Sequence, residues 1–292
     1  MSEHSISRHP SDYERQAIRE IRDWEKPDES LLGVVRRHVY DAYNFTADQV
    51  RKIPGVDWTI ENVIAGLIRL INEITLDWVP SESILKKYEQ GDQTVDGLAD
   101  IRGLDLEIVD RAAADVAVTY RNLAGAEGAA TGFAGAAGIP TDVVALVALN
   151  LRAAGEYATY YGFDISSDFE RLYALTLLDH VAQPSTKAKD VAMSPVVKLT
   201  SRLARMQAFE VIEQIAMSKA VSRIVRSIGI HLTRAKLAQL IPVTGAVIGG
   251  GYNAYYTSKV CNTAYHSYRR RFLINKYGSH VVDGVAEKAE SP

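Results

Sequence analysis

One stretch of low charge constrains the fold more than any other. From Gly128 to Leu149 the sequence reads GAATGFAGAAGIPTDVVALVAL, and Asp142 is its only charged residue. Gly128 and Gly132 are four residues apart, so on a helix they share a face and form a smooth ridge that another helix can approach closely. Glycine inside a helix costs about 1 kcal/mol relative to alanine. The run therefore needs close helix packing, or a break in the helix, to be stable.

Pro140 supplies a natural position for that break, because proline interrupts helical hydrogen bonding. We expect two helices to meet at residues 138–140, with Thr141 or Asp142 capping the second. We expect this second helix to end near Tyr161, since Gly162 suits the position just past a helix.

A second run without charges covers residues 237–258 and shares features with the first. It repeats the Ile-Pro dipeptide and places Gly245 and Gly249 four residues apart. We interpret this as a weak internal repeat, which predicts two Gly/Ala-rich buried helix pairs.

Helical periodicity dominates the rest of the chain. Apolar residues recur at helical spacing in residues 13–25, 56–74 and 104–122, and a short helix is expected after Pro80. Ser167 and Glu170 have the spacing of a capping box at the start of a further helix. Runs of alternating β-branched residues are absent. The sequence therefore predicts an all-α fold, a single helical domain of about nine or ten helices over residues 11–277. We expect a disordered N-terminus at residues 1–10 and a loose C-terminal tail at residues 278–292.

Charge is distributed very unevenly along this chain of 292 residues. Residues 1–183 carry a net charge of −13 and residues 184–282 a net charge of +12. The domain thus divides into an acidic half, residues 11–183, and a basic half, residues 184–277. The basic half either docks on the acidic half or leaves a basic face free for phosphates on lipid or nucleic acid.

Two groups of basic residues are candidates for contact with an anionic surface. Lys219, Arg223 and Arg226 repeat at helical spacing opposite apolar residues, as Lys198, Arg202 and Arg205 do before them. A tyrosine-rich final helix ends in a second group, which consists of Arg269, Arg270 and Arg271. Tyrosine and arginine favour a membrane interface. Nucleic-acid binding is the weaker alternative, because no recognition motif accompanies the charge.

Few residues are candidates for catalysis. Glu127 and Asp142 lie in a setting of small residues where a ligand can approach closely, and His180 directly follows the carboxylate residue Asp179. The alternatives are structural: a paired Glu127, a capping Asp142 and a His180 at a helix end. Phosphate-binding loops and the H-E-x-x-H and G-x-S-x-G motifs are absent. With Cys261 as the single cysteine, we expect no disulfide, metal or cofactor.

The length of the two charge-free runs raises the question of a membrane. Each has about 22 residues, enough to cross a bilayer as a helix. Each also contains a proline and is rich in alanine and glycine, and one contains Asp142, which is costly in a membrane. We therefore favour buried core helices over hairpin-like membrane contact. The polar N-terminus lacks an apolar signal core, so we expect a cytoplasmic protein.

Several segments together resemble the EcsC family. The resemblance rests on EGAATGFAG at residues 127–135, YYGFD at residues 160–164, and the later segment from Ile241–Pro242 to Arg271–Phe272. This family takes its name from a bacterial operon that also encodes the ATPase and membrane subunit of an ABC exporter. The resemblance implies a mostly helical bacterial accessory protein near the membrane. It carries no settled activity or set of catalytic residues.

These observations favour a non-enzymatic, membrane-associated helical protein. Its expected partners are an anionic membrane surface or a membrane protein complex, reached from the cytoplasmic side. The alternative is a hydrolase-type enzyme with a carboxylate/histidine site formed by Glu127, Asp142 and His180.

Overall fold

The fold is all-α, as the sequence predicts. The computed structural model describes residues 9–25, 50, 53–73, 79, 81–91, 93–132, 135–183, 214–238 and 250–283. Within these ranges the regular structure is helical throughout. The helices are α1 (Asp12–Glu25), α3 (Val56–Glu73), α4 (Ser81–Gln90), α5 (Leu98–Ile101), α6 (Leu106–Ala112), α7 (Val116–Gly132), α8 (Gly135–Tyr160), α9 (Asp168–Ala182), α11 (Gln214–Ala238), α12 (Gly250–Tyr277) and α13 (Ser279–Asp283).

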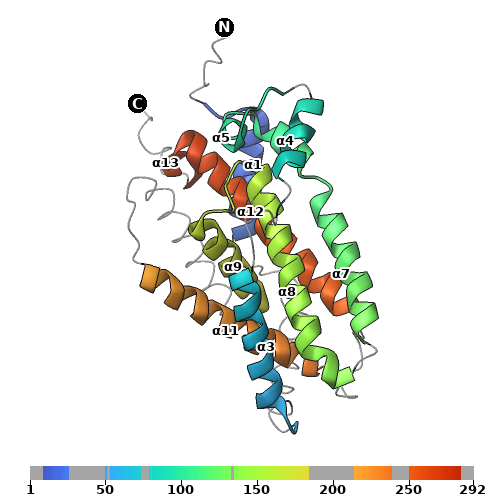
Figure 1. The fold of residues 1–292 in the computed structure, drawn as a ribbon. Helices are drawn as coiled ribbons and strands as arrows, with labels where there is room; N and C mark the ends of the chain where they lie inside the picture. Colours follow the sequence, from blue (N-terminus) through green and yellow to red (C-terminus); the bar gives the residue numbers. More distant parts are fainter. Residues whose placement is uncertain are drawn as a thin grey trace.

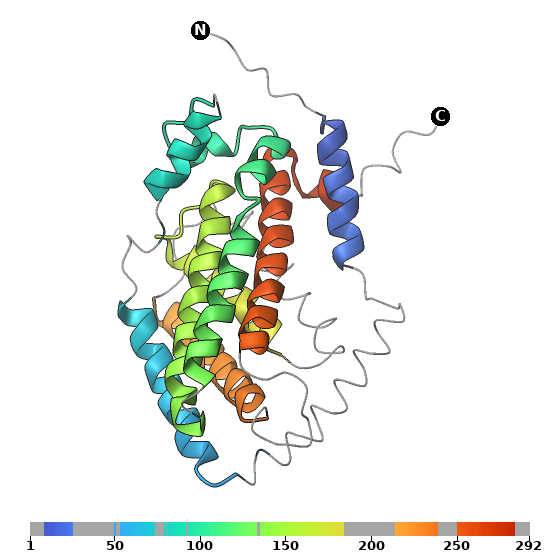
Figure 2. The ribbon, with the colours of Figure 1, turned by 90° about the vertical axis from the view of Figure 1, so that its right-hand side faces the viewer.

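Helix α12 is the centre of the bundle. It packs against α1, α6, α7, α8, α9 and α13, and its most extensive contact is with α7. Figure 2 shows α7, α8 and α12 side by side along the long axis of the molecule, with α1 against one end of α12. Helices α3 and α11 pack against each other and against α8 toward the opposite end (Figure 1). Helix α12 is therefore surrounded mainly by helices that precede it in the sequence.

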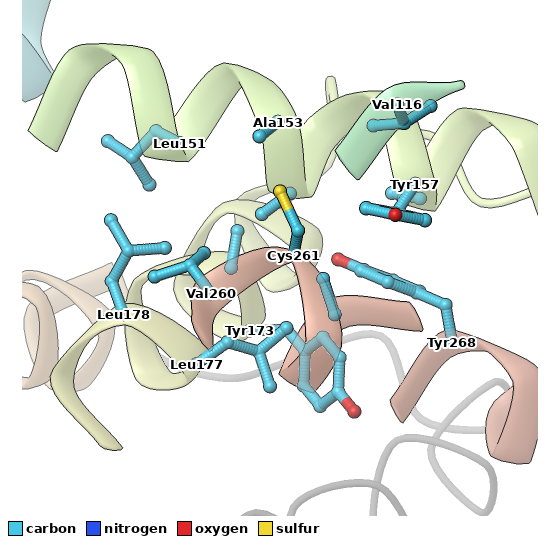
Figure 3. Close-up of a cluster of buried hydrophobic side chains, with 14 of the residues drawn as sticks. Val116, Leu151, Ala153, Tyr157, Tyr173, Leu177, Leu178, Val260, Cys261 and Tyr268 are labelled. Carbon is cyan, nitrogen blue, oxygen red and sulfur yellow. The ribbon is translucent and has the colours of Figure 1, made fainter. Parts of the chain in front are cut away.

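Tyrosine and small residues fill much of the core. Figure 3 shows Cys261 of α12 across from Ala153 and Tyr157 of α8, with Tyr173 of α9 close by. Burial raises the pKa of the Cys261 thiol to about 12. The thiol is therefore protonated at neutral pH and unreactive, because the thiolate is the nucleophile.

The break in the Gly/Ala-rich run lies earlier than predicted. Helix α7 ends at Gly132 and α8 begins at Gly135, so Pro140 and Asp142 both lie inside α8. The prediction of a break at residues 138–140 is therefore wrong, and so is the cap at Asp142. Pro140 sits only five residues after the first residue of α8, so the missing N–H affects a hydrogen bond near the helix start.

Other predicted boundaries are partly confirmed. Helix α8 ends at Tyr160 and Gly162 has φ +79°, the left-handed conformation that follows many helices. The helix expected over residues 104–122 is instead divided between α6 and α7, and Asp105 caps α6 by accepting the Glu107 N–H at 2.9 Å.

The chain after Gly278 also differs from the prediction. Residues 279–283 form the short helix α13, which packs on α12, so they are not a loose tail. The remaining residues of the expected tail, 284–292, and residues 1–8 lie outside the described part of the chain.

One helix of the described residues passes a simple test for a membrane span. Residues 137–160, within α8, are long and apolar enough by length and composition, and an 18-residue window among them has a mean hydropathy of 1.3. Half of that window is buried inside the bundle, where α8 packs on α3, α7, α9, α11 and α12. A core helix of this kind passes the same test, so the finding is weak evidence for a membrane span.

Candidate functional site

A buried ion pair with an amide partner joins three helices. The Nζ atom of Lys236 on α11 lies 2.6 Å from Oδ2 of Asp142 on α8, and both side chains are 8% exposed. Asn253 on α12 donates from Nδ2 to Oδ1 of Asp142 at 3.1 Å and accepts a hydrogen bond from Lys236. Each of the three side chains thus contacts the other two. Buried charges need this kind of pairing and hydrogen bonding.

Glu127 on α7 lies close enough to this pair to share its electrostatics. Burial is the largest cause that raises the pKa of the Glu127 carboxyl, and the negative charge of Asp142 raises it further. The positive charge of Lys236 opposes both effects. Two of the three predicted catalytic candidates, Glu127 and Asp142, are therefore neighbours. We call Glu127, Asp142, Lys236 and Asn253 the core polar cluster.

His180 has a different position. It is buried near the C-terminal end of α9, and it is not among the partners described for the core polar cluster. The partners that the structure gives Asp142 are a lysine and an asparagine, Lys236 and Asn253. Sequence reasoning missed Lys236 and Asn253, although Lys236 directly precedes the second charge-free run and Asn253 lies within it.

The three consecutive arginines are buried, which corrects their predicted role. Arg269 donates from Nε to Asp110 of α6 at 2.7 Å and from Nη1 to Glu20 of α1 at 2.8 Å. Asp110 also accepts hydroxyl hydrogen bonds from Tyr13 at 2.8 Å and Tyr161 at 2.5 Å. Burial raises the pKa of the Asp110 carboxyl, and Arg269 is the main opposing influence.

The other two arginines contact further carboxylates. Arg270 lies 3.0 Å from Glu25 of α1 and 2.5 Å from Asp283 of α13. Arg271 donates from two nitrogens to the two oxygens of Glu170 on α9. Aromatic rings surround its guanidinium, with centroids at 4.0 Å (Phe163), 4.5 Å (Tyr173) and 5.5 Å (Tyr268). The arginines fix α12 to surrounding helices and are not available to an anionic surface.

The ion pair between Arg271 and Glu170 takes the place of the capping box predicted at the start of α9. Ser167 is the N-cap residue of α9, as expected, but its side chain makes no capping hydrogen bond. Glu170, the expected capping-box partner, binds Arg271 instead.

The basic residues of α11 behave differently. Lys219, Arg223 and Arg226 are all exposed, whereas Val225, Ile228 and Leu232 on the same helix are buried. Among the described residues, none of the three basic side chains forms an ion pair within 4.0 Å. We call Lys219, Arg223 and Arg226 the α11 basic stripe. The earlier stripe, with Lys198, Arg202 and Arg205, lies outside the described residues.

Small residues do line a close contact between helices. Gly128 is buried on α7, and a Cβ atom placed at Gly125 would lie 3.8 Å from Cβ of Ala254 on α12. Gly132 is the last residue of α7, while Gly245 and Gly249 lie outside the described residues. This contact between α7 and α12 lies three residues before the start of the Gly/Ala-rich run at Gly128.

An open groove lies beside Asp110 and was not predicted. Its volume is about 560 Å³, which is within the range of small-molecule sites. The lining side chains come from α1, α6, α7, α8 and α12 and from the α6–α7 turn: Tyr13, Glu107, Asp110, Arg111, Ala113, Ala114, Ala117, Tyr157, Ser258, Cys261, Asn262 and Tyr265. These residues are far apart in sequence, so local patterns give no signal for their convergence.

The fold and these clusters define an all-α bundle protein with a polar cluster in its core and a basic outer helix. Among the described residues, no group of histidine, cysteine, aspartate and glutamate side chains could hold a metal ion. The chain belongs to the EcsC protein family, which it matches over residues 15–273.

Two curated relatives from Bacillus subtilis (strain 168) are similar to this chain. One is named "Uncharacterized protein YdbA" and is 24% identical over 63% of this chain and 65% of its own length. The other is named "Protein EcsC" and is 25% identical over 67% of this chain and 78% of its own length. The chain thus spans just under two thirds of the first relative. No solved structure matches.

Proposed function

We propose that this protein is a non-enzymatic accessory protein that binds the anionic inner face of a membrane through the α11 basic stripe. The observation that supports the proposal is the contrast between two groups of basic residues. Arg269, Arg270 and Arg271 are buried against carboxylates, whereas Lys219, Arg223 and Arg226 point away from the buried face of α11. Family membership is consistent with a place beside a membrane protein complex such as an ABC exporter.

The stripe supplies a useful binding energy. A basic residue near an anionic lipid surface contributes about 1 kcal/mol. Three such residues give about 3 kcal/mol, which corresponds to roughly a 100-fold effect on the partition coefficient. An interaction of this size is reversible, as expected for a peripheral protein.

Vesicle co-sedimentation with a charge-reversed variant tests the proposal. The triple variant Lys219→Glu, Arg223→Glu and Arg226→Glu should bind anionic phosphatidylserine-containing vesicles about 100-fold or more weakly. Its melting temperature should stay close to that of the unmodified protein, because the three side chains are exposed.

A matched control separates position from net charge. Arg69, Lys86 and Arg121 are also exposed, and they lie on α3, α4 and α7. Reversing these three to Glu changes the net charge by the same amount and should weaken vesicle binding much less. Equal binding to anionic and neutral vesicles, or equal losses in the two triple variants, would count against the proposal.

The hydrolase alternative has one observation in its favour, the proximity of Glu127 and Asp142. Lys236 and Asn253 already occupy both oxygens of Asp142, however. A carboxylate held in this way is better suited to joining helices than to taking a proton from water. If Glu127 were catalytic, Glu127→Gln should abolish hydrolysis of a substrate while keeping the melting temperature.

A further inference from the structure

The groove beside Asp110 has a buried floor and a polar rim. Asp110, Ala113, Tyr157 and Cys261 are buried, whereas the rim residues Glu107, Arg111, Ala114, Ser258 and Asn262 are exposed. Tyr13 and Tyr265 lie between the floor and the rim. A ligand that enters the groove would therefore meet aromatic and apolar atoms below and polar groups at the mouth.

Tyrosine rings give the groove a specific electrostatic character. The rings of Tyr157 and Tyr265 meet edge to face, with centroids 6.3 Å apart. Aromatic faces carry negative potential, which attracts cations. Two of the lining rings already attract a cation from behind the groove, since the guanidinium of Arg269 lies 4.8 Å from the centroid of Tyr265 and 5.9 Å from that of Tyr13.

The charged groups around the groove also favour a positively charged ligand. Arg269 is fully engaged by Asp110 and Glu20, and it does not line the groove. The only lining cation among the described residues is Arg111, which is exposed and lies 3.1 Å from Glu107. An anion would thus find no buried positive partner among the described residues, whereas a cation would find the exposed carboxylate of Glu107. The Asp110 carboxylate, by contrast, is already bound by Arg269 and two tyrosine hydroxyls.

Other cations of this protein are bound by the same combination of groups. Arg271 is held by Glu170 among aromatic rings, and Lys236 is held by Asp142 with its Nζ atom 5.4 Å from the ring centroid of Tyr252. In those cases the cation comes from the chain itself. The groove offers the Glu107 carboxylate and tyrosine rings at a surface that is open to solvent.

We propose that the groove lined by Tyr13, Glu107, Asp110, Tyr157 and Tyr265 binds a small organic cation, an amine with an apolar portion. The ammonium group would lie toward Glu107 and the tyrosine faces, and the apolar portion would lie over Ala117 and Cys261. This site is distinct from the α11 basic stripe, and it does not depend on the membrane proposal.

Three probes of similar shape test the charge preference. Phenethylamine is cationic at neutral pH, 2-phenylethanol is neutral and 3-phenylpropionate is anionic. Titration calorimetry and saturation-transfer NMR on the full-length protein should show that phenethylamine binds at least about tenfold more tightly than the alcohol. The carboxylate should bind most weakly. Absence of amine binding to the folded protein, or equal affinity for amine and alcohol, would overturn the proposal.

Two variants locate the bound probe. Glu107→Gln should reduce the preference for amine over alcohol at least about threefold without a change in melting temperature, because Glu107 is exposed. Tyr265→Leu should weaken amine binding more strongly. If Tyr265→Leu does not fold, the Glu107→Gln variant alone tests whether the amine binds in the groove.

Matched controls come from the same fold. Tyr255 lies on the same helix as Tyr265, is 58% exposed and does not line the groove. Glu82 is an exposed carboxylate on α4. Tyr255→Leu and Glu82→Gln should leave phenethylamine affinity unchanged, and a loss equal to that of the groove variants would place the binding elsewhere and refute the site.

Discussion

At the scale of single residues, buried charges determine which substitutions are costly. Asp142 and Lys236 are each 8% exposed and are bridged by Asn253. Removing one member of a buried pair leaves the other charge without compensation, which typically costs about 3–5 kcal/mol. Glu127 is close enough to Lys236 to compensate in part, so the lower end of that range applies.

We therefore expect Asp142→Ala to lower the free energy of unfolding by about 3 kcal/mol. The double variant Asp142→Ala with Lys236→Met should be less destabilised than this single variant, because no unpaired charge remains. Urea denaturation of the single and double variants measures both values. As a control, Asp12→Ala breaks only the exposed pair with Arg15 and should cost under about 1 kcal/mol. A double variant that is less stable than Asp142→Ala would contradict this account.

A second prediction concerns the pH dependence of stability. Burial, followed by the positive charge of Arg269, lowers the pKa of His266 from 6.5 to about 4, while Glu20 opposes the change. The unfolded chain therefore binds the proton more strongly, so stability falls as the pH falls from 6.5 toward 4. The loss approaches about 3 kcal/mol at the acidic end.

The variant His266→Phe isolates this contribution. A phenyl ring can keep the stacking on Trp24, where the ring centroids are 4.8 Å apart, but it does not titrate. The free energy of unfolding of the variant should change less between pH 6.5 and 4 than that of the unmodified protein. Carboxylates such as Glu14, whose pKa is lowered, act in both proteins and cancel in the comparison. Parallel pH profiles would show that His266 is not responsible.

The sequence identified some of these residues but not their partners. Asp142 is noticeable because it is the only charge in its run, and Glu127 borders the same run. Asn253, however, is 111 residues from Asp142, and Arg269 is 159 residues from Asp110. Such pairings depend on how helices pack, which periodicity within one helix does not reveal.

At the scale of helices, the prediction succeeded where one face is clearly apolar. Residues 13–25, residues 56–74 and the segment after Pro80 were predicted to be helical, and α1, α3 and α4 confirm this. The α7–α8 boundary was misplaced, because small residues and a proline permit several breaks and tertiary packing selects among them. The tail after Gly278 was misjudged because Asp283 gains a buried partner in Arg270.

Two glycine substitutions test this interpretation at the helix ends and interfaces. A Cβ atom at Gly162 would lie 2.6 Å from the backbone oxygen of Leu98, and φ is +79° there. Gly162→Ala should therefore lower the free energy of unfolding by at least about 2 kcal/mol. Gly125 is inside α7 and has room for a methyl group beside Ala254, so Gly125→Ala should stabilise by up to about 1 kcal/mol. Thermal and urea unfolding measure the change in the free energy of unfolding for each variant. Changes of the same sign in the two variants would contradict the prediction.

At the scale of the whole molecule, the charge asymmetry has two consequences. Part of the basic half binds the acidic half: Arg269, Arg270, Arg271 and Lys276 of α12 pair with carboxylates of α1, α6 and α9. The α11 basic stripe remains exposed. From the sequence alone, the basic half could either dock on the acidic half or leave a basic face exposed. The arginines of α12 dock on carboxylates because α12 is central, whereas the α11 basic stripe is exposed because α11 presents one face to solvent.

Raising the salt concentration should distinguish the exposed α11 basic stripe from the buried ion pairs of α12. The screening length falls from about 10 Å at 0.1 M salt to about 3 Å at 1 M, and buried pairs are screened much less than exposed charges. If the exposed stripe carries membrane attraction, raising NaCl from about 0.1 M to about 1 M should release the protein from anionic vesicles in a flotation assay. Neutral vesicles provide the baseline for this release.

The same salt change should leave the fold intact, because the arginine pairs of α12 are 2–9% exposed on the arginine side. We expect the free energy of unfolding at about 1 M NaCl to stay within about 1 kcal/mol of its value at 0.1 M. Vesicle binding that persists at high salt would mean that apolar contacts, and not the α11 basic stripe, hold the protein at the membrane. A large loss of stability would mean that the ion pairs between the two halves are more accessible to solvent than their burial indicates.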